Sequence, residues 1–151
     1  LELEYDGQYI VIAGRPAKPA GQAVLHGESD LATITAEVAA FPERFRQIKA
    51  GWLSRINALH AAGKRVILWG GGSKAVSFLT TLGLQEQIDF VVDINPHKHG
   101  KFTSGTGHAV KSPESLKELR PDSIILMNPV YVKEVGEMLH KMGLDPQILP
   151  V

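Results

Sequence analysis

Residues 65–75 of this 151-residue chain read Arg65-Val66-Ile67-Leu68-Trp69-Gly70-Gly71-Gly72-Ser73-Lys74-Ala75. The segment 65–68, which is apolar after Arg65, predicts a buried strand. Apolar residues at helical spacing after the glycines predict a helix that ends near Leu82, before Gly83. The turn between them fits Gly70-x-Gly72-x-x-Ala75, the glycine fingerprint of doubly wound nucleotide-binding sheets. We therefore expect a Rossmann-like α/β fold.

This glycine turn also predicts a phosphate site. Gly70 permits a tight turn, Gly72 lets the backbone approach a ligand, and the small Ala75 lets the helix pack on the strand. The start of the helix, at Ser73 and Lys74, offers free N–H groups and the positive end of the helix dipole to an anion.

Composition limits the function classes. The 16 basic and 16 acidic residues cancel, so general affinity for nucleic acid or an anionic membrane is not expected. No apolar run is long enough to span a membrane. The absence of cysteine excludes disulfides and thiolate metal ligands, and a cytoplasmic location is expected. Because the sequence starts neither with methionine nor with a signal peptide, we interpret it as a piece of a longer chain.

The first 28 residues predict a small separate part. Residues 1–14 alternate apolar and polar side chains around Asp6-Gly7, a type I′ turn signal, and this pattern is typical of a β-hairpin. Such a hairpin is marginal alone and should pair with an edge strand or with another copy. Residues 15–28 contain two prolines and two glycines and are interpreted as a linker, so the main domain would cover 29–151.

A long helical region follows the linker. Ser29 or Asp30 can cap a helix, and Pro42 should break it, kink it or begin a second helix that ends at Gly63. The apolar residues at helical spacing are Leu31, Ile34, Val38 and Phe41, then Phe45, Ile48, Trp52, Ile56 and Leu59. The second of these two stripes, from Phe45 to Leu59, is interpreted as packing onto the sheet that follows. The alternative is a face that binds a partner.

The rest of the chain repeats strand and helix. Ser112 should cap a helix that ends at Arg120, and another helix should run from Val132 to Gly143. The further strands are expected at 88–92, 109–110, 123–127 and 147–149. Repeated β-then-α units with short connections require a parallel sheet with right-handed crossovers, and we expect the strand order 3-2-1-4-5.

Polar residues follow the strands of this sheet at the edge where such folds bind ligands. Asp93 lies 23 positions after Gly70, where an acidic residue can bind a ribose hydroxyl. The following Asn95-Pro96 equally favours a turn or capping role for Asp93, and both interpretations stay open. Asn128 and Tyr131 leave another strand at the same rim.

The loop at 95–108 is rich in cations and histidines. Lys98 and Lys101 suit phosphate, while His97 and His99 suit sugar hydroxyls or acid–base chemistry. A metal site that adds His108 is not favoured, because the spacing of the histidines matches no usual ligand pattern. A solvated loop without function remains an alternative.

Several segments together resemble the C-terminal domain of S-adenosylmethionine-dependent C-methyltransferases, whose best-known members act on nucleotide-linked deoxysugars. The segments are Leu68–Lys74, then Val91-Val92-Asp93-Ile94-Asn95-Pro96-His97-Lys98-His99-Gly100-Lys101, then Gly105-Thr106-Gly107-His108, then Arg120-Pro121-Asp122 before an apolar strand. The similarity spans roughly Ser29 to Val151. The hairpin at 1–14 resembles the closing strands of the preceding methyltransferase domain.

The resemblance implies a parent protein with a zinc-binding N-terminal part and a central methyl-transfer domain, both upstream of these residues. S-adenosylmethionine, the metal and the catalytic residues would then belong to those parts, and this domain would help to enclose a nucleotide-linked sugar. The substrate-binding residues would be Gly70, Gly72, Ser73, Lys74, Asp93, Asn95, His97, Lys98, Lys101, Asn128 and Tyr131. The expected partners are the sugar nucleotide and the upstream domain.

Two other functions fit the same sequence. The first is an NAD(P)-binding module, which the glycine fingerprint and Asp93 allow. The second is a scaffold without a ligand, in which a homodimer forms through the 1–14 hairpin or the helices of 30–62. If a side chain such as Trp69 or Phe102 filled the space that the glycine turn faces, no phosphate would fit, and the scaffold would be favoured.

Overall fold

The computed structural model describes residues 2–4, 7, 9–14 and 30–151. The chain divides into two compact units, Leu1–Ile48 and Lys49–Val151, and the boundary falls inside the first long helix. Each unit is described by itself.

The unit 49–151 contains a five-stranded sheet in which every neighbouring pair is parallel. Its strands are β3 (Val66–Trp69), β4 (Val91–Val92), β5 (Val110–Lys111), β6 (Ser123–Leu126) and β7 (Gln147–Pro150). The spatial order is β5-β4-β3-β6-β7, which is 3-2-1-4-5 when the strands are counted from β3. The strand after Arg65 therefore lies at the centre of the sheet.

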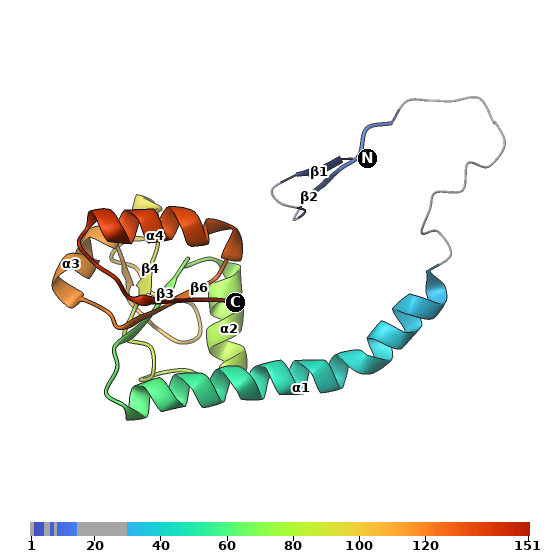
Figure 1. Ribbon diagram of the computed structural model, residues 1–151, viewed down its shortest axis with the longest axis horizontal. Coiled ribbons are helices and arrows are strands. Elements are labelled where there is room, and N and C mark those ends of the chain that lie inside the picture. The colour runs from blue at the N-terminus through green and yellow to red at the C-terminus, as the bar shows by residue number, and fades with distance from the viewer. Residues whose placement is uncertain (1, 5–6, 8, 15–29) are drawn as a thin grey trace. The chain divides into compact units, whose positions relative to one another are not determined.

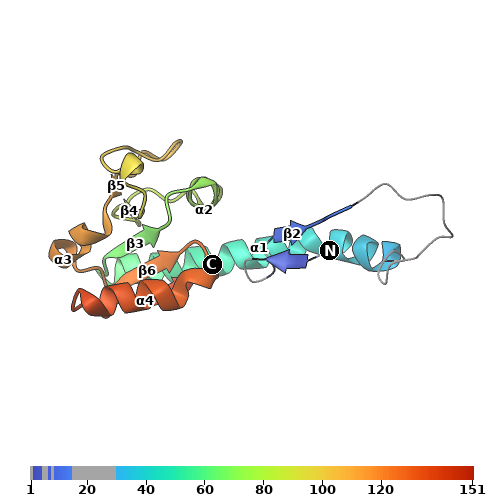
Figure 2. The same cartoon turned by 90° about the horizontal axis from the view of Figure 1, so that it is seen from above.

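Helices cover both faces of this sheet (Figures 1 and 2). Val66 and Leu68 of β3 pack in one apolar cluster with the end of α1 (Leu31–Ala61) and with α2 (Ser73–Leu82). Ile67 and Trp69 point to the other face, where they pack with α3 (Leu116–Leu119) and α4 (Val132–Lys141). The alternation of side chains along a strand thus places helices on both faces, and the predicted doubly wound α/β class is confirmed.

The predicted helix after the glycine turn is also confirmed. Gly72 is the N-cap of α2, and Gly83, with φ 65°, ends it in the left-handed conformation that glycine adopts most readily. Ala75 is fully buried in the cluster beside β3, as the fingerprint requires. The helix therefore begins directly at the carboxyl end of the central strand.

Two local predictions need correction. The strand expected at 88–92 is shorter, because only Val91–Val92 joins the sheet. Ser112 does not cap with its side chain; it precedes a 3₁₀ turn, Pro113–Ser115, in which the Ser115 hydroxyl donates to the Ser112 carbonyl at 2.6 Å. The short α3 follows, and it ends at Arg120 as expected. The 3₁₀ turn thus takes the place of the side-chain cap that was predicted at Ser112.

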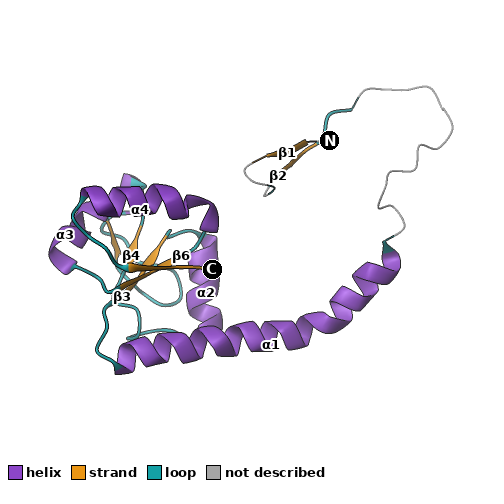
Figure 3. Cartoon of the chain, in the orientation of Figure 1, coloured by secondary structure: helices purple, strands orange, loops and turns teal. Residues whose placement is uncertain are grey.

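In the long helical region, two of the three alternatives for Pro42 are wrong, because the helix is not broken there and no second helix begins; a kink stays a prediction. Pro42 lies inside one continuous helix, α1, drawn in purple in Figure 3. Proline removes one backbone donor, but the neighbouring turns keep theirs, and Glu43 pairs with Arg46 at 2.6 Å across the next turn. The prediction that the second apolar stripe packs onto the sheet is wrong for Phe45 and Ile48, whose side chains are 44% and 56% exposed.

In the unit 1–48, β1 (Glu2–Glu4) and β2 (Tyr9–Val11) form the predicted hairpin (Figure 1). They pair antiparallel in a two-stranded sheet of their own, with Leu3 opposite Ile10, and Gly7 has φ 78° between them. Asp6, the predicted linker at 15–28 and the cap at Ser29 lie outside the described residues. No helix in the described ranges has the length and apolar character needed to cross a membrane.

Candidate functional site

The candidate site lies where the neighbouring central strands β3 and β6 end. The chain leaves β3 for α2 on one face of the sheet and leaves β6 for α4 on the other face. Parallel sheets bind ligands in the crevice that opens where two connections diverge in this way. Gly70 follows β3 directly, and Asn128 comes shortly after the end of β6. Both residues line the crevice.

The glycine turn is a close-packed piece of backbone. Gly70 has φ 104°, which a residue with a Cβ rarely adopts, and its N–H donates to the Val92 carbonyl at 2.7 Å. A Cβ on Gly71 would lie 3.2 Å from Cγ1 of Val91 and 3.3 Å from Oδ2 of Asp93. Gly71, which the fingerprint leaves as an unspecified position, is thus the glycine that the protein itself packs against.

Gly72 faces open space. A Cβ built there meets nothing within 4 Å, so neither Trp69 nor Phe102 covers this position. No side chain caps α2, and its first turn, which includes Ser73 and Lys74, contains no acidic residue. The first N–H groups of α2 therefore keep their positive potential for an external anion.

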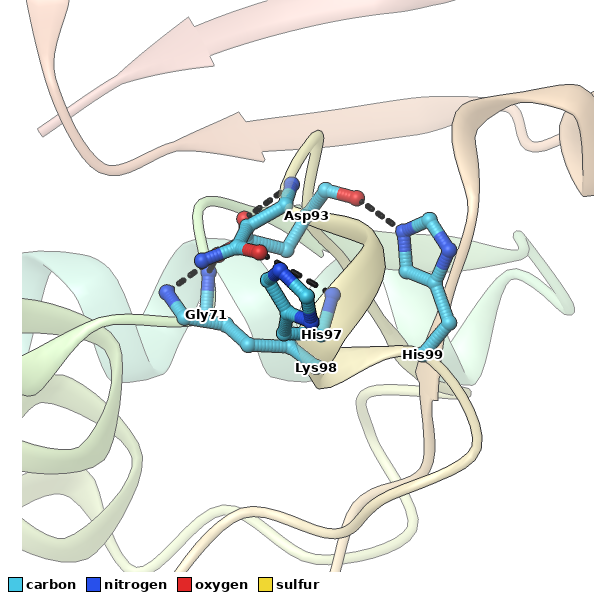
Figure 4. Close-up of polar contacts among 6 residues, drawn as sticks. Gly71, Asp93, His97, Lys98 and His99 are labelled. Atoms are coloured by element: carbon cyan, nitrogen blue, oxygen red, sulfur yellow. Dashed lines mark hydrogen bonds and ion pairs between the residues drawn. The ribbon is translucent and has the colours of Figure 1, made fainter.

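Asp93 connects the glycine turn to the following loop (Figure 4). Its Oδ2 accepts from the Gly71 N–H and from Nζ of Lys98, both at 2.8 Å, and its Oδ1 accepts from the Asn95 N–H at 2.8 Å. His99 Nε2 lies 2.7 Å from the Asp93 carbonyl oxygen. These contacts are the ones expected if Asp93 caps the turn. Binding of a ribose hydroxyl by Asp93 stays a prediction.

The environment of Asp93 favours its charged form. Burial by itself raises the pKa of the Asp93 carboxyl, but hydrogen bonds from Lys98, Asn95 and Gly71, together with the charge of Lys98, outweigh burial and hold the pKa below its usual value. The carboxylate is therefore ionised at neutral pH and fixes the glycine turn and the loop as one piece.

A first hollow, of about 240 Å³, opens beside Gly70 between β6 and α4. Its walls are mostly apolar and include Trp69, Val135 and Met138. Polar groups from Asn128, Tyr131, Glu134 and Asp93 also line it. Such a lining, apolar with a few polar groups, is typical of small-molecule sites.

A second hollow, of about 180 Å³, opens on the side of β5. Gly71 lines it together with Lys98, Lys101, Phe102 and Ser104. Lys98 is paired with Asp93, whereas Lys101 forms no ion pair within the described part of the chain. The excess positive charge of this hollow thus comes from Lys101.

The structure brings most of the predicted site residues together. Around the first hollow lie Gly70, Asp93, Asn128 and Tyr131; around the second lie Lys98 and Lys101; and Gly72, Ser73 and Lys74 begin α2. Asn95 and His97 line neither hollow, because Asn95 Oδ1 accepts from the His97 N–H at 3.0 Å and the His97 side chain is exposed. Asn95 and His97 therefore have a local loop contact.

Sequence reasoning missed Gly71, Phe102, Glu134 and Met138 as lining residues. The spacing of Tyr131, Glu134 and Met138 places them on one face of a helix that begins beside Asn128, and this signal was available in the sequence. For Gly71 no such signal exists, because its constraint comes from the approach of Val91 and Asp93.

His108, the third histidine of the loop at 95–108, makes hydrogen bonds within the fold. His108 is buried, with Nδ1 2.9 Å from the Thr106 hydroxyl and Nε2 2.9 Å from the Gln85 carbonyl oxygen. Within the ranges that the structure describes, no group of three or more His, Asp or Glu residues is placed to hold a metal ion. His108 thus joins the loop to the segment that follows α2.

The fold and the site define a Rossmann-like domain with an open glycine turn. Over residues 8–145 the sequence matches the family described as the C-methyltransferase C-terminal domain. Since the match covers most of its length, the chain belongs to this family. No curated protein matches the sequence.

Several solved structures are similar in fold. A UDP-D-quinovosamine 4-dehydrogenase from Vibrio fischeri has 22% identity and a TM-score of 0.46, and the match covers 58% of this chain and 77% of that one. RSP, a Rex-family repressor, has 17% identity and a TM-score of 0.40, over 63% of this chain and 57% of the repressor. RSP in complex with β-NADH gives the same identity and TM-score, over 58% and 53% of the two chains.

Proposed function

We propose that this chain is the substrate-positioning domain of an S-adenosylmethionine-dependent C-methyltransferase and that it binds a nucleotide-linked sugar. Membership of the C-methyltransferase family supports the reaction class. The observation that carries the substrate class is the uncapped start of α2 after a glycine turn whose Gly70 lines an apolar hollow and whose Gly71 lines a lysine-lined hollow.

The diphosphate would lie at the glycine turn. The open space at Gly72 admits a phosphate, and the first N–H groups of α2 would donate to its oxygens. Lysine binds phosphate as a point charge. Lys101 would supply most of that charge, because Asp93 already neutralises Lys98. Lys101 is therefore the residue whose removal should affect a diphosphate most.

The sugar would occupy the hollow beside β6 and α4. Its mostly apolar wall suits a deoxysugar, because a ring with few hydroxyls leaves few polar groups to satisfy. Asn128 and Glu134 can hydrogen-bond the remaining hydroxyl or carbonyl groups, and Tyr131 can cover one ring face. The diphosphate at Gly72 would then hold the sugar at the same carboxyl edge of the sheet.

In this proposal S-adenosylmethionine, bound to an upstream domain, supplies the methyl group to a sugar carbon made nucleophilic by proton loss next to a ketone. The residues described here fix the substrate by its diphosphate and its ring. Such positioning can lower a barrier by several kcal/mol, roughly 7–11 at the limit. No catalytic residue of this chain is proposed.

Isothermal titration calorimetry tests the proposal. A thymidine-diphosphate sugar should bind this chain, and Lys101→Ala should weaken binding about tenfold by removing one charge-assisted contact. Lys117→Ala is the matched control, because Lys117 is exposed and lines neither hollow. S-adenosylmethionine should not bind. Binding of NADH but not of the sugar nucleotide, or no binding at millimolar ligand, would overturn the proposal.

A further inference from the structure

Six large apolar side chains in the first half of α1 are exposed. Their exposed fractions lie between 44% and 78%, and they are Leu31, Ile34, Val38, Phe41, Phe45 and Ile48. All six lie in the unit Leu1–Ile48. Single exposed apolar residues are ordinary, but a continuous stripe over five turns of helix marks a surface that binds something.

The spacing of this stripe is that of a coiled coil. Successive members are 3, 4, 3, 4 and 3 residues apart, which is the a/d pattern of a heptad repeat with Leu31 at an a position. A strict 3.5-residue repeat keeps one narrow seam facing a second helix, whereas a helix that packs on a sheet needs a wider face. The pattern therefore indicates a single helix as the partner.

We propose that this stripe pairs with the same stripe of a second copy, antiparallel, to form a two-helix coiled coil. The stripe is self-complementary in that direction: Leu31 meets Ile48 of the second copy, Ile34 meets Phe45, and Val38 meets Phe41. A two-fold axis then passes between residues 39 and 40, so the three pairs occur twice. This yields six closed apolar layers and leaves no member of the stripe unpaired.

Charge selects the antiparallel direction. The residues at g positions are Glu37 and Arg44, and antiparallel pairing in this register brings Glu37 beside Arg44 of the second copy, twice by symmetry. Parallel pairing would instead bring Arg44 beside Lys49 and Glu37 beside Pro42. Both Glu37 and Arg44 are exposed and form no ion pair within the described residues. Only the antiparallel pair is complementary.

Pro42 is compatible with this arrangement. It takes the e position, which flanks the seam, so its ring does not replace an apolar contact. Phe41 and Phe45 stack on each other, with ring centroids 5.9 Å apart, and present one aromatic surface to Val38 and Ile34 of the second copy. The aromatic pair thus forms the centre of the proposed interface.

Sedimentation equilibrium tests the interface. The chain should form a dimer of twice 16.4 kDa, and Arg44→Glu should weaken it roughly tenfold, because two attractive pairs become repulsive. The double variant Glu37→Arg/Arg44→Glu should restore the dimer. Arg46→Glu is the control, because Arg46 takes an outer b position and makes its ion pair within the helix.

Three results would overturn the proposal. They are a monomer at all accessible concentrations, a dimer that Arg44→Glu and Phe41→Ala leave unchanged, and a loss in Arg44→Glu that the double variant does not restore. The second result would assign dimerisation to another surface, such as the 1–14 hairpin. Far-ultraviolet circular dichroism of each variant shows that α1 remains folded.

Spin labels test the direction independently. The chain has no cysteine, so Ala40→Cys and Ala50→Cys each give one label site on the exposed outer side of α1. In the antiparallel pair the axial offset between identical labels is about 2 Å at position 40 and about 30 Å at position 50. Equal short distances at both positions would mean parallel pairing and would overturn the register.

Discussion

Both halves of α1 carry apolar residues at helical spacing, but their surroundings are opposite. In the second half, Trp52, Leu53 and Leu59 pack against the core of the sheet and Ile56 is fully buried. Every large apolar residue of the first half, up to Ile48, is exposed. Periodicity thus predicts which face of a helix needs a partner, but it does not identify the partner.

The spacing within each half indicates the kind of partner. The first half keeps a strict a/d seam, which suits another helix. The second half changes, because Arg55 occupies the next d position while Leu53 and Ile56 widen the apolar face. A wider face suits a sheet. A change of period within one helix can therefore mark the boundary between two packing environments.

The largest effect should come from the buried half. Ile56→Ala removes a fully buried side chain from the cluster that joins α1 to the sheet. The free energy of unfolding should fall by about 2–5 kcal/mol. Urea titration followed by tryptophan fluorescence measures it, because both tryptophans, Trp52 and Trp69, lie in the unit 49–151. A loss no larger than that of an exposed position would contradict the assigned packing.

The glycine turn should respond differently at two adjacent positions. Gly71→Ala places a Cβ 3.2 Å from Val91 and 3.3 Å from Asp93, and it should cost about 1–3 kcal/mol of stability. Gly72→Ala meets nothing and has an extended backbone, so its stability should change by less than about 0.5 kcal/mol.

The same pair of variants separates folding from binding. A methyl group at Gly72 would stand where the diphosphate is proposed to approach, so Gly72→Ala should weaken the sugar nucleotide about tenfold while the fold stays intact. Calorimetry of both variants measures this. If Gly72→Ala bound the sugar nucleotide with unchanged affinity, the proposed position of the diphosphate at the glycine turn would be wrong.

The next effect is a pH dependence. Because the pKa of Asp93 is lowered in the folded state, its stabilising contribution is present above the unfolded value of about 3.8 and is lost as the pH falls through the folded value. Between about pH 5 and pH 3, the wild type should lose on the order of 1 kcal/mol more than Asp93→Asn, as expected for hydrogen bonds to a charged group. The exposed Asp145→Asn is the control for urea titrations across this range.

The smallest effect should come from the exposed half of α1. Ile34→Ala, measured at concentrations where the chain is monomeric, should change the stability of the unit 49–151 by less than about 0.5 kcal/mol. Tryptophan fluorescence again provides the measurement. A loss of several kcal/mol would show that the first half of α1 packs against the sheet after all.

Most of the fold could be predicted because short-range signals agree with it. The glycines at 70–72 and 83 set the ends of α2, and buried apolar runs set β3 and β6. Pro42 predicts a break, a kink or a second helix, because a helix interior disfavours proline. One lost hydrogen bond is not enough to end a helix of 31 residues.

The candidate site is predictable in part. Lys101, Asn128 and Tyr131 can be found because polar residues that follow parallel strands gather at one edge of the sheet. The hydrogen bonds of Asp93 to Gly71 and Lys98 could not be assigned, because they depend on how closely β4 approaches the turn. Tertiary distances of this kind have no signature in residue spacing.

The most direct measurement for the proposed function is an amide NMR titration of this chain with a thymidine-diphosphate sugar. Saturable shifts are expected at Gly72, Ser73, Lys74 and Lys101, with further shifts at Asn128 and Tyr131 that thymidine diphosphate alone does not produce. Shifts confined to other surfaces, or none at saturating ligand, would contradict the assignment of the site.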